Sequence, residues 1–367
     1  TRLFDTLASR LDGANLARFA DALDEPSDGQ LFGASIANRA SDSATEQFIR
    51  TSAARAESDP TTAVAVAEAI GGLANNPAAL ERALSGLTQT QIDKIVQAAT
   101  QERMHTNPFG SSVTFTYDAA PLGRALEAVS RIQNPDIKAR FFEAGAAQLK
   151  KLEETNTGLG LVVLKGDSER QVRDGLTAIL NSDTTGVVGS LENEFRDGKG
   201  LTAYMKSMLE NGQERQVGEM ISRLLEGNDH SQNPVERFGA RVNRPDGPQY
   251  DNAEDVGFFL GAVHAAARQI TGDRDKQANI VKNVFSSIAG AVGATGPQAG
   301  VAAALLNGLT TAAVDDVVSR LNNGTLELRD ALRLLAFPRD PQTNEPYEGA
   351  AEAAYDSAVG RVIDANG

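Results

Sequence analysis

The spacing of the apolar residues is the feature that most limits the folds open to this chain. Over most of its length they recur three and four positions apart, as in segments 122–132 and 217–225. This spacing places them on one face of an α-helix, whereas a half-buried strand requires strict alternation. The composition agrees, because aromatic residues, which strands favour, make up only 5% of the chain and tryptophan is absent. We therefore expect an all-α fold.

Helix starts are marked by a residue that can cap a helix, followed by proline. The capping side chain accepts a hydrogen bond from a free N–H of the first turn, and proline has no such N–H to satisfy. Four dipeptides fit this pattern: Asp59-Pro60, Asn76-Pro77, Asn134-Pro135 and Asn233-Pro234. In addition, Ser43 with Glu46 and Thr88 with Gln91 have the spacing of a reciprocal capping box, so we expect helices to begin there.

The predicted helices form consecutive pairs. These pairs span residues 42–74, 76–102, 118–155, 167–197 and 199–226. A spacing of about 30–40 residues is typical of helix-turn-helix arrays, in which each pair buries its apolar face against its neighbours. No consensus recurs at a fixed offset. We therefore expect an irregular α-solenoid-like stack of helix pairs, followed by a smaller multi-helical lobe.

A loop rich in proline, glycine and asparagine indicates where the two parts meet. Residues 228–251 include Pro234, Pro245 and Pro248 and carry no helical apolar stripe. This segment predicts an N-terminal helical array over residues 1–227 and a C-terminal helical lobe over residues 252–367. The helices expected in the lobe are Ala253–Ile270, Asp273–Ala294, Pro297–Leu321, Thr325–Phe337 and Glu348–Asp364.

Two short segments have the pattern of extended chain. Val113, Phe115 and Tyr117 alternate with polar residues, as in a half-buried strand, and Leu159–Leu164 is apolar enough to pair with them. A two-stranded ribbon is one interpretation. We favour an ordered loop, and neither alternative changes the fold class.

Charge and cysteine content narrow the possible partners and chemistry. The formal net charge is −14, and the basic residues are dispersed rather than clustered, which argues against binding to nucleic acid or to anionic membrane surfaces. The absence of cysteine excludes disulfides, thiolate catalysis and metal sites with cysteine ligands.

The three histidines, His105, His230 and His264, give no catalytic or metal-binding pattern. Two lie in predicted loops and the third borders an apolar helix face, and none has a second ligand at the spacing of a zinc site. We interpret all three as residues without a catalytic or metal-binding role.

Acidic residues that are neighbours in sequence also give no site. A hydrolase needs two carboxyl groups that face each other, but helical residues one or two positions apart point in different directions. The pairs concerned are Glu153/Glu154, Glu192/Glu194 and Asp315/Asp316. We therefore assign no catalytic, cofactor-binding or metal-binding residue and expect no cofactor. A hydrolase with an unrecognised carboxylate site stays open as an alternative.

One long segment is free of charge. No charged residue occurs from Asn283 to Val314, and Thr295-Gly296-Pro297 divides this segment into two helices, each too short for a typical membrane span. One interpretation is an insertable hairpin of the pore-forming-toxin kind. We favour a buried hairpin in the core of the C-terminal lobe, with Ile288 and Leu305 inside it.

Two regions resemble a known class of proteins. The first is SDTTGVVGSLENEFRDGKGLTAYMKSML (Ser182–Leu209), and the second runs from NAEDVGFFLGAVHAAARQI (Asn252–Ile270) to LLAFPRDPQTNEPYEGA (Leu334–Ala350). They resemble helical regions of long, multidomain bacterial proteins of the secreted-effector or polymorphic-toxin type. The resemblance implies a non-catalytic accessory region and carries over no residue roles. The start at Thr1 rather than Met agrees with a processed or excised piece.

The expected function is therefore a non-enzymatic protein-interaction or structural module of a larger bacterial protein, such as a secreted effector or toxin. Its partner is expected to be a protein, bound in grooves between helix pairs. The membrane-active hairpin and the carboxylate hydrolase are the alternatives. The compartment and the oligomeric state do not follow from the sequence.

Overall fold

α-Helices form nearly all of the described chain, which confirms the all-α prediction. The computed structural model describes residues 2–106, 113–154, 162–164, 167–226, 240–241, 249–250, 252–294, 311–336 and 350–367. Its contacts divide the chain into two units, a first unit of Thr1–Asp183 and a second unit of Thr184–Gly367.

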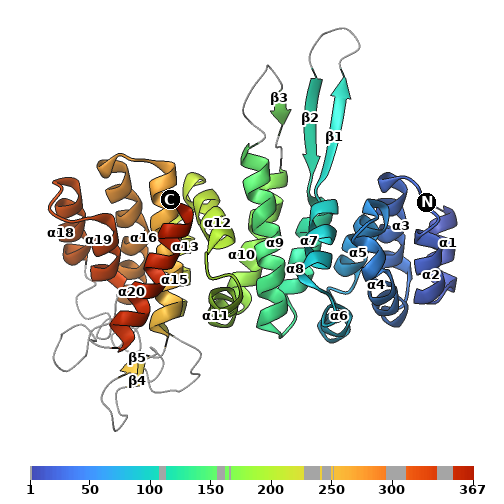
Figure 1. Ribbon diagram of the computed structural model, residues 1–367, viewed down its shortest axis with the longest axis horizontal. Coiled ribbons are helices and arrows are strands. Elements are labelled where there is room, and N and C mark those ends of the chain that lie inside the picture. Colours follow the sequence, from blue (N-terminus) through green and yellow to red (C-terminus); the bar gives the residue numbers. More distant parts are fainter. Residues whose placement is uncertain are drawn as a thin grey trace. The chain divides into compact units, whose positions relative to one another are not determined.

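The first unit is a double row of helices (Figure 1). Its helices are α1 (Arg2–Arg10), α2 (Gly13–Ala20), α3 (Pro26–Arg39), α4 (Asp42–Ala56), α5 (Pro60–Gly72), α6 (Pro77–Leu84), α7 (Gln89–Ala98), α8 (Ala120–Ser130), α9 (Pro135–Glu154) and α10 (Ser168–Ser182). In one row, α1, α3, α5, α8 and α10 follow one another, and each helix packs on the next. The second row contains α2, α4 and α6, and α7 packs on α9. This arrangement is the expected irregular α-solenoid-like stack. Its core includes all residues of α5 from Thr61 to Ile70, which are buried.

The predicted helix caps are largely present. Asp59 and Asn76 accept backbone hydrogen bonds from Thr61 and Ala79 at 3.0 and 3.2 Å. Asn134 does the same at the start of α9, and Thr88 with Gln91 forms the complete capping box of α7. Asn233-Pro234 lies outside the described residues.

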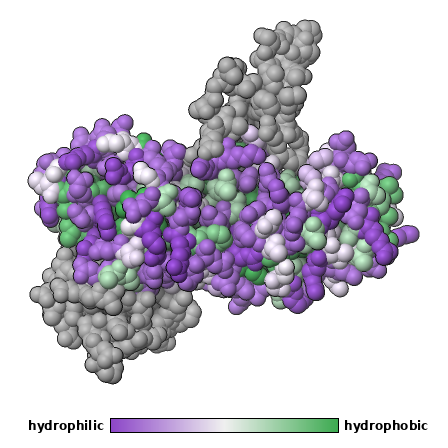
Figure 2. Space-filling view, in the orientation of Figure 1, coloured by the Kyte–Doolittle hydropathy of each residue, from purple (hydrophilic) through white to green (hydrophobic). Residues whose placement is uncertain are grey.

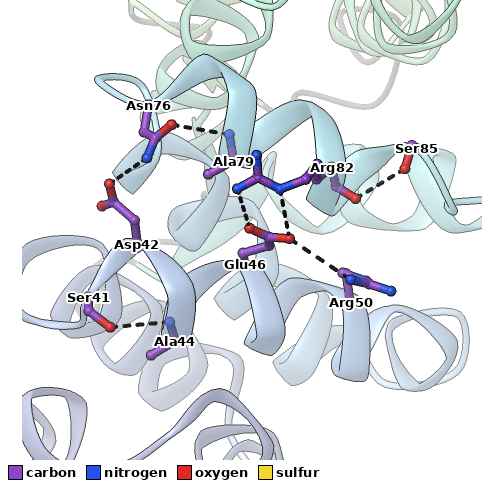
Figure 3. A network of polar contacts seen from close by, with 9 residues as sticks. All are labelled: Ser41, Asp42, Ala44, Glu46, Arg50, Asn76, Ala79, Arg82 and Ser85. Carbon is purple, nitrogen blue, oxygen red and sulfur yellow. Dashed lines mark hydrogen bonds and ion pairs between the residues drawn. The ribbon is translucent and has the colours of Figure 1, made fainter.

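The capping box expected at Ser43 is wrong. Helix α4 begins two residues earlier, and Ser41 is its cap, accepting from Ala44 N at 3.3 Å (Figure 3). The carboxylate of Glu46 instead accepts hydrogen bonds from Nε and Nη2 of Arg82, at 3.3 and 2.9 Å. Glu46 therefore joins α4 to α6, a contact between helices that local spacing does not reveal.

Three strands interrupt the helices of the first unit. β1 (Gln101–Thr106) and β2 (Val113–Asp118) pair antiparallel, with Gln101 opposite Asp118 and Thr106 opposite Val113. β3 (Val162–Leu164) pairs parallel with β2. In Figure 1, β1 and β2 extend away from the helices. The favoured ordered loop was therefore wrong. The pairing of the two predicted segments was right. β1, which overlaps the end of the expected helix pair 76–102, was missed because its residues do not alternate.

The second unit contains the helices after residue 183. They are α11 (Thr184–Glu194), α12 (Lys199–Glu210), α13 (Glu214–Glu226), α15 (Ala253–Ile270), α16 (Arg274–Ala294), α18 (Thr311–Asn322), α19 (Leu328–Ala336) and α20 (Ala350–Asn366). The bounds of α15 match the prediction, and α15 packs along α20 and against α12. Gly257 and Gly261 allow this close approach, because a Cβ at either would lie within 3.0 Å of α20.

The contacts divide the chain at a different point from the expected loop. Helices α11, α12 and α13, which the sequence placed in the N-terminal array, pack on helices that follow residue 252. A Cβ at Gly218 of α13 would lie 2.4 Å from the carbonyl oxygen of Val284 in α16, so these two helices touch along their backbones. Of the expected linker 228–251, only β4 (Ala240–Arg241) and β5 (Gln249–Tyr250) lie within the described residues, and they pair antiparallel.

The described parts of the uncharged segment are packed against other helices. α16 contacts α13, α18 and α19, and Ile288 is 1% exposed. Lys282 and Asp315, which flank the segment, form an ion pair at 3.0 Å. Leu305 and residues 295–310 lie outside the described residues. Among the helices that the structure describes, none combines the length and the hydropathy needed to cross a membrane.

The surface is mostly hydrophilic on the face shown in Figure 2. Large apolar side chains are exposed at Leu3 of α1, Leu31 of α3 and Leu334 of α19, which are 63%, 45% and 39% exposed. Scattered apolar residues of this kind are common on protein surfaces.

Candidate functional site

A groove of about 490 Å³ lies on the first unit between α8 and α10. Its lining residues are Ala120, Gly123, Arg124 and Glu127 from α8, and Gln171, Asp174, Gly175 and Ala178 from α10. A volume of this size is within the range of ligand-binding clefts.

The strands determine how the two helices are placed. β2 leads into α8 and β3 leads into α10, and these two strands pair parallel. The hydroxyl of Ser168, the first residue of α10, donates to the carbonyl oxygen of Tyr117 in β2 at 2.5 Å. The helices consequently begin side by side and run in the same direction, so residues at equal depth along each helix face each other across the groove.

Two glycines form the floor of the groove. A Cβ at Gly175 would lie 2.7 Å from Cβ of Leu126, whereas one at Gly123 would lie 3.4 Å from Cβ of Gln171. Gly175 therefore allows a backbone approach that a larger residue would prevent. Ala120 and Ala178 also line the groove and contribute only methyl groups. The side chains of Gln171 and Leu126 lie against Gly123 and Gly175, respectively.

The walls of the groove carry charged and amide side chains, of which some pair with other side chains and some do not. Arg124 Nη2 donates to both carboxylate oxygens of Glu68, at 2.8 and 2.7 Å, and Glu68 is 3% exposed on the buried helix α5. Glu127 pairs with Arg131 at 2.8 Å. Across the groove, the side chains of Gln171 and Asp174 have no hydrogen-bond or ion-pair partner among the described residues. The α10 wall thus offers groups that a ligand could bind.

A second cavity of the first unit provides a comparison. It measures about 420 Å³ and is lined by the turn between α4 and α5 together with parts of α7 and α9, including Gln97 and Ala98. Two acidic residues, Glu57 and Asp59, line this cavity. Asp59 is already used as the cap of α5, where it also accepts the Thr62 hydroxyl at 2.6 Å. This cavity therefore has less free hydrogen-bonding capacity on Asp59 than the groove has on Asp174.

The second unit contains a cluster of three carboxyl groups around one guanidinium. Arg361 of α20 donates to Glu192 of α11 and, at 3.0 Å, to Glu254 in the first turn of α15. Asp255 follows Glu254, and burial, with a smaller contribution from the two glutamates, raises its pKa to about 7. Burial also raises the pKa of Glu192. The cluster joins three helices and holds a proton near neutral pH.

Sequence reasoning missed this cluster. It considered Glu192 with its neighbour Glu194, but Glu192 is buried and Glu194 is exposed, so the two do not face each other. Asp315 and Asp316 likewise bind different partners, Lys282 and Arg320. The available signal was the position of Glu192 four residues after the buried Val188, on the apolar face of its helix. Among the described residues, no three His, Asp or Glu side chains are arranged to hold a metal ion.

The histidines are not brought together within the described chain. His105 lies in β1, and His230 lies outside the described residues. His264 of α15 is 5% exposed, and its Nδ1 has no hydrogen-bond partner among the residues described. Burial, with smaller effects of Arg268 and Arg329, lowers its pKa to about 4, so the imidazole is neutral at pH 7.

The groove and the acidic cluster are therefore the two notable polar sites of the described chain. The groove has two polar side chains without a partner among the described residues, whereas in the cluster the carboxylates of Glu192 and Glu254 are paired with the internal Arg361. Comparison of the chain with protein-family models, with curated proteins and with solved structures finds no match.

Proposed function

We propose that this chain is a non-enzymatic protein-interaction module of a larger bacterial protein, of the secreted-effector or toxin kind, and that it binds its partner in the groove between α8 and α10. The observation that carries the proposal is an open groove with a glycine floor and an α10 wall whose Gln171 and Asp174 have no partner among the described residues. Polar side chains that lack internal partners are available to a ligand without breaking existing bonds.

The chemistry of the lining residues supports binding rather than catalysis. Among the described residues that line the groove, there is no serine, threonine, histidine or lysine. Its arginine is held by two hydrogen bonds to Glu68 and is a poor candidate for a reacting group. Nucleophilic or general-base catalysis needs a group that is positioned and activated by a neighbour. The groove supplies recognition groups without such a pair.

Site-specific photo-crosslinking tests this proposal. A benzoylphenylalanine at Ala178, inside the groove, should crosslink one defined partner in cells that produce the whole protein. The same residue at Gln97, in the second cavity, is the matched control and should not crosslink that partner. The partner, identified by mass spectrometry, is then purified and titrated against the protein.

Blocking the groove should weaken the purified complex. Ala178→Trp fills the groove and should reduce affinity at least about tenfold, whereas Gln97→Trp should not. Thermal unfolding of both variants shows whether the helices remain packed. A partner that binds a folded Ala178→Trp variant as well as the wild type would exclude the groove as the binding site.

A further inference from the structure

We infer that the groove between α8 and α10 binds a basic segment of its protein partner, with an arginine side chain lying over the glycine floor and its guanidinium at Asp174. This inference rests on the proposed function and specifies its partner. It follows from the charges of the walls, the shape of the floor and the hydrogen-bonding capacity of α10.

The charges of the groove sum to a negative value. The lining residues Arg124, Glu127 and Asp174, with the direct ion-pair partners Glu68 and Arg131, comprise two positive and three negative groups, a net charge of −1. Asp174 is the group without a counter-charge among the described residues. It is exposed and stands on the rim of the groove, where an incoming cation can reach it.

The ion pair between Arg124 and Glu68 disfavours an acidic segment. Such a segment would need an uncompensated cation in the groove, and the charge of Arg124 is balanced by Glu68, because its Nη2 donates to both carboxylate oxygens. Glu68 also receives Gln30 Nε2 at 3.4 Å and is buried, so it fixes Arg124 from below. Drawing Arg124 away would leave a buried carboxylate without its partner, which is strongly unfavourable. The formal net charge of −14 also favours a basic segment, since it steers positive ligands toward the protein.

The floor suits the stem of a long basic side chain. Gly123 and Gly175 carry no side chain, and Ala120 and Ala178 contribute only methyl groups to the lining of the groove. Lysine and arginine bury their methylene stems along apolar surface while their charged ends remain at a polar rim. Arginine fits better than lysine, because its planar fork can donate two bonds to the Asp174 carboxylate and another to the Gln171 amide oxygen.

Titration calorimetry with three short probes tests this inference. The probes are Ac-GARGARG-NH₂ and the same peptide with both arginines replaced by citrulline or by glutamate. Citrulline keeps the shape of arginine without its charge. We expect the wild-type protein to bind the arginine peptide, and the citrulline and glutamate peptides to bind at least about tenfold more weakly.

The protein variants locate the binding. Asp174→Asn should weaken binding of the arginine peptide about tenfold or more, because it removes the carboxylate and keeps the shape. Asp24→Asn is the matched control, since Asp24 is also exposed and has no ion-pair partner among the described residues, and it should leave the affinity unchanged. Equal losses in the two variants, binding of the glutamate peptide, or no binding of the arginine peptide at millimolar concentration would each overturn the inference.

The purified partner separates this inference from the proposed function. If Ala178→Trp weakens the partner complex and Asp174→Asn does not, the groove binds the partner without a basic contact, and only the inference fails. If neither substitution weakens the complex, the proposed function fails as well. Weakening by both substitutions supports both.

Discussion

Replacing Asp255 with asparagine should stabilise the second unit near neutral pH and have less effect in acid. In the folded chain Asp255 is surrounded by Glu192, Glu254 and, through them, Arg361, and its pKa is about 7 instead of 3.8. Between these two values the folded state binds a proton that the unfolded state has released. The contribution of Asp255 to stability is therefore fully present below pH 3.8 and is lost as the pH rises to 7.

The size of this loss follows from the shift in pKa. A difference of roughly three pH units corresponds to about 4 kcal/mol of unfolding free energy above pH 7 and about 2 kcal/mol at pH 5. An asparagine at this position avoids the loss. Above pH 7, where Asp255 is ionised, the substitution also removes a negative charge from the first turn of α15, which costs about 0.5 kcal/mol. We expect Asp255→Asn to stabilise the second unit by about 3 kcal/mol at pH 7–8 and by about 2 kcal/mol at pH 5.

Urea unfolding of the whole chain at pH 5, 6, 7 and 8 measures this difference. Pulsed hydrogen exchange followed by mass spectrometry, with the pulse at a single pH, reads α15 and α20 separately from the first unit. Asp364→Asn is a matched control, because Asp364 is an exposed acid of α20 without an ion-pair partner among the described residues. A stabilisation by Asp255→Asn that is the same at pH 5 and pH 8, or a loss of stability at both, would refute the reasoning.

Three further substitutions test other features of the fold. In the wild type, stability should fall as the pH drops from 7 to 5, because histidine takes up a proton in the unfolded chain while the buried imidazole of His264, with its pKa lowered to about 4, stays neutral. His264→Gln should reduce this loss by about 2 kcal/mol in urea titrations. Ile288→Asp should cost several kcal/mol and unfold the second unit in a thermal melt, whereas Asn283→Asp, at an exposed position, should not. The wild-type protein should release no dye from liposomes at pH 4–5. Gly175→Ala, whose Cβ would lie 2.7 Å from Leu126, should cost about 1–3 kcal/mol in urea unfolding, while Gly123→Ala, at 3.4 Å, should cost much less.

The fold class could be predicted because local chemistry determines where helices begin. Asp59, Asn76 and Thr88 cap the helices they were expected to cap, and α15 has its predicted bounds. β1 could not be predicted in the same way. Its sequence, QERMHT, has neither alternation nor β-branched residues before Thr106, so pairing with β2 rather than intrinsic preference makes it a strand.

The division into units and both sites depend on contacts between distant residues. Gly218 fits against Val284 of α16, and this contact assigns α13 to the second unit, although the loop after α13 looked like a boundary. The groove depends on Gly175 lying against Leu126, about fifty positions away. The usable signal was a glycine within an amphipathic helix, flanked by Gln171, Asp174 and Ala178 at helical spacing. Such a signal indicates a close helix contact but not its partner.

The opposite pH dependences of Asp255 and His264 should nearly cancel in the wild type. Both residues lie on α15, and from pH 5 to pH 7 Asp255 lowers stability by about 2 kcal/mol while His264 raises it by a similar amount. They are nine positions apart, about 13 Å along the helix, so their effects should add. The unfolding free energy of the second unit should therefore change little over this range, apart from the contributions of its other acids, which all variants share. Asp255→Asn should make it rise with pH, His264→Gln should make it fall, and the double variant should again follow the wild type. A double variant whose pH dependence resembles either single variant would show that the two groups do not act independently and that this balance is not the source of the flat profile.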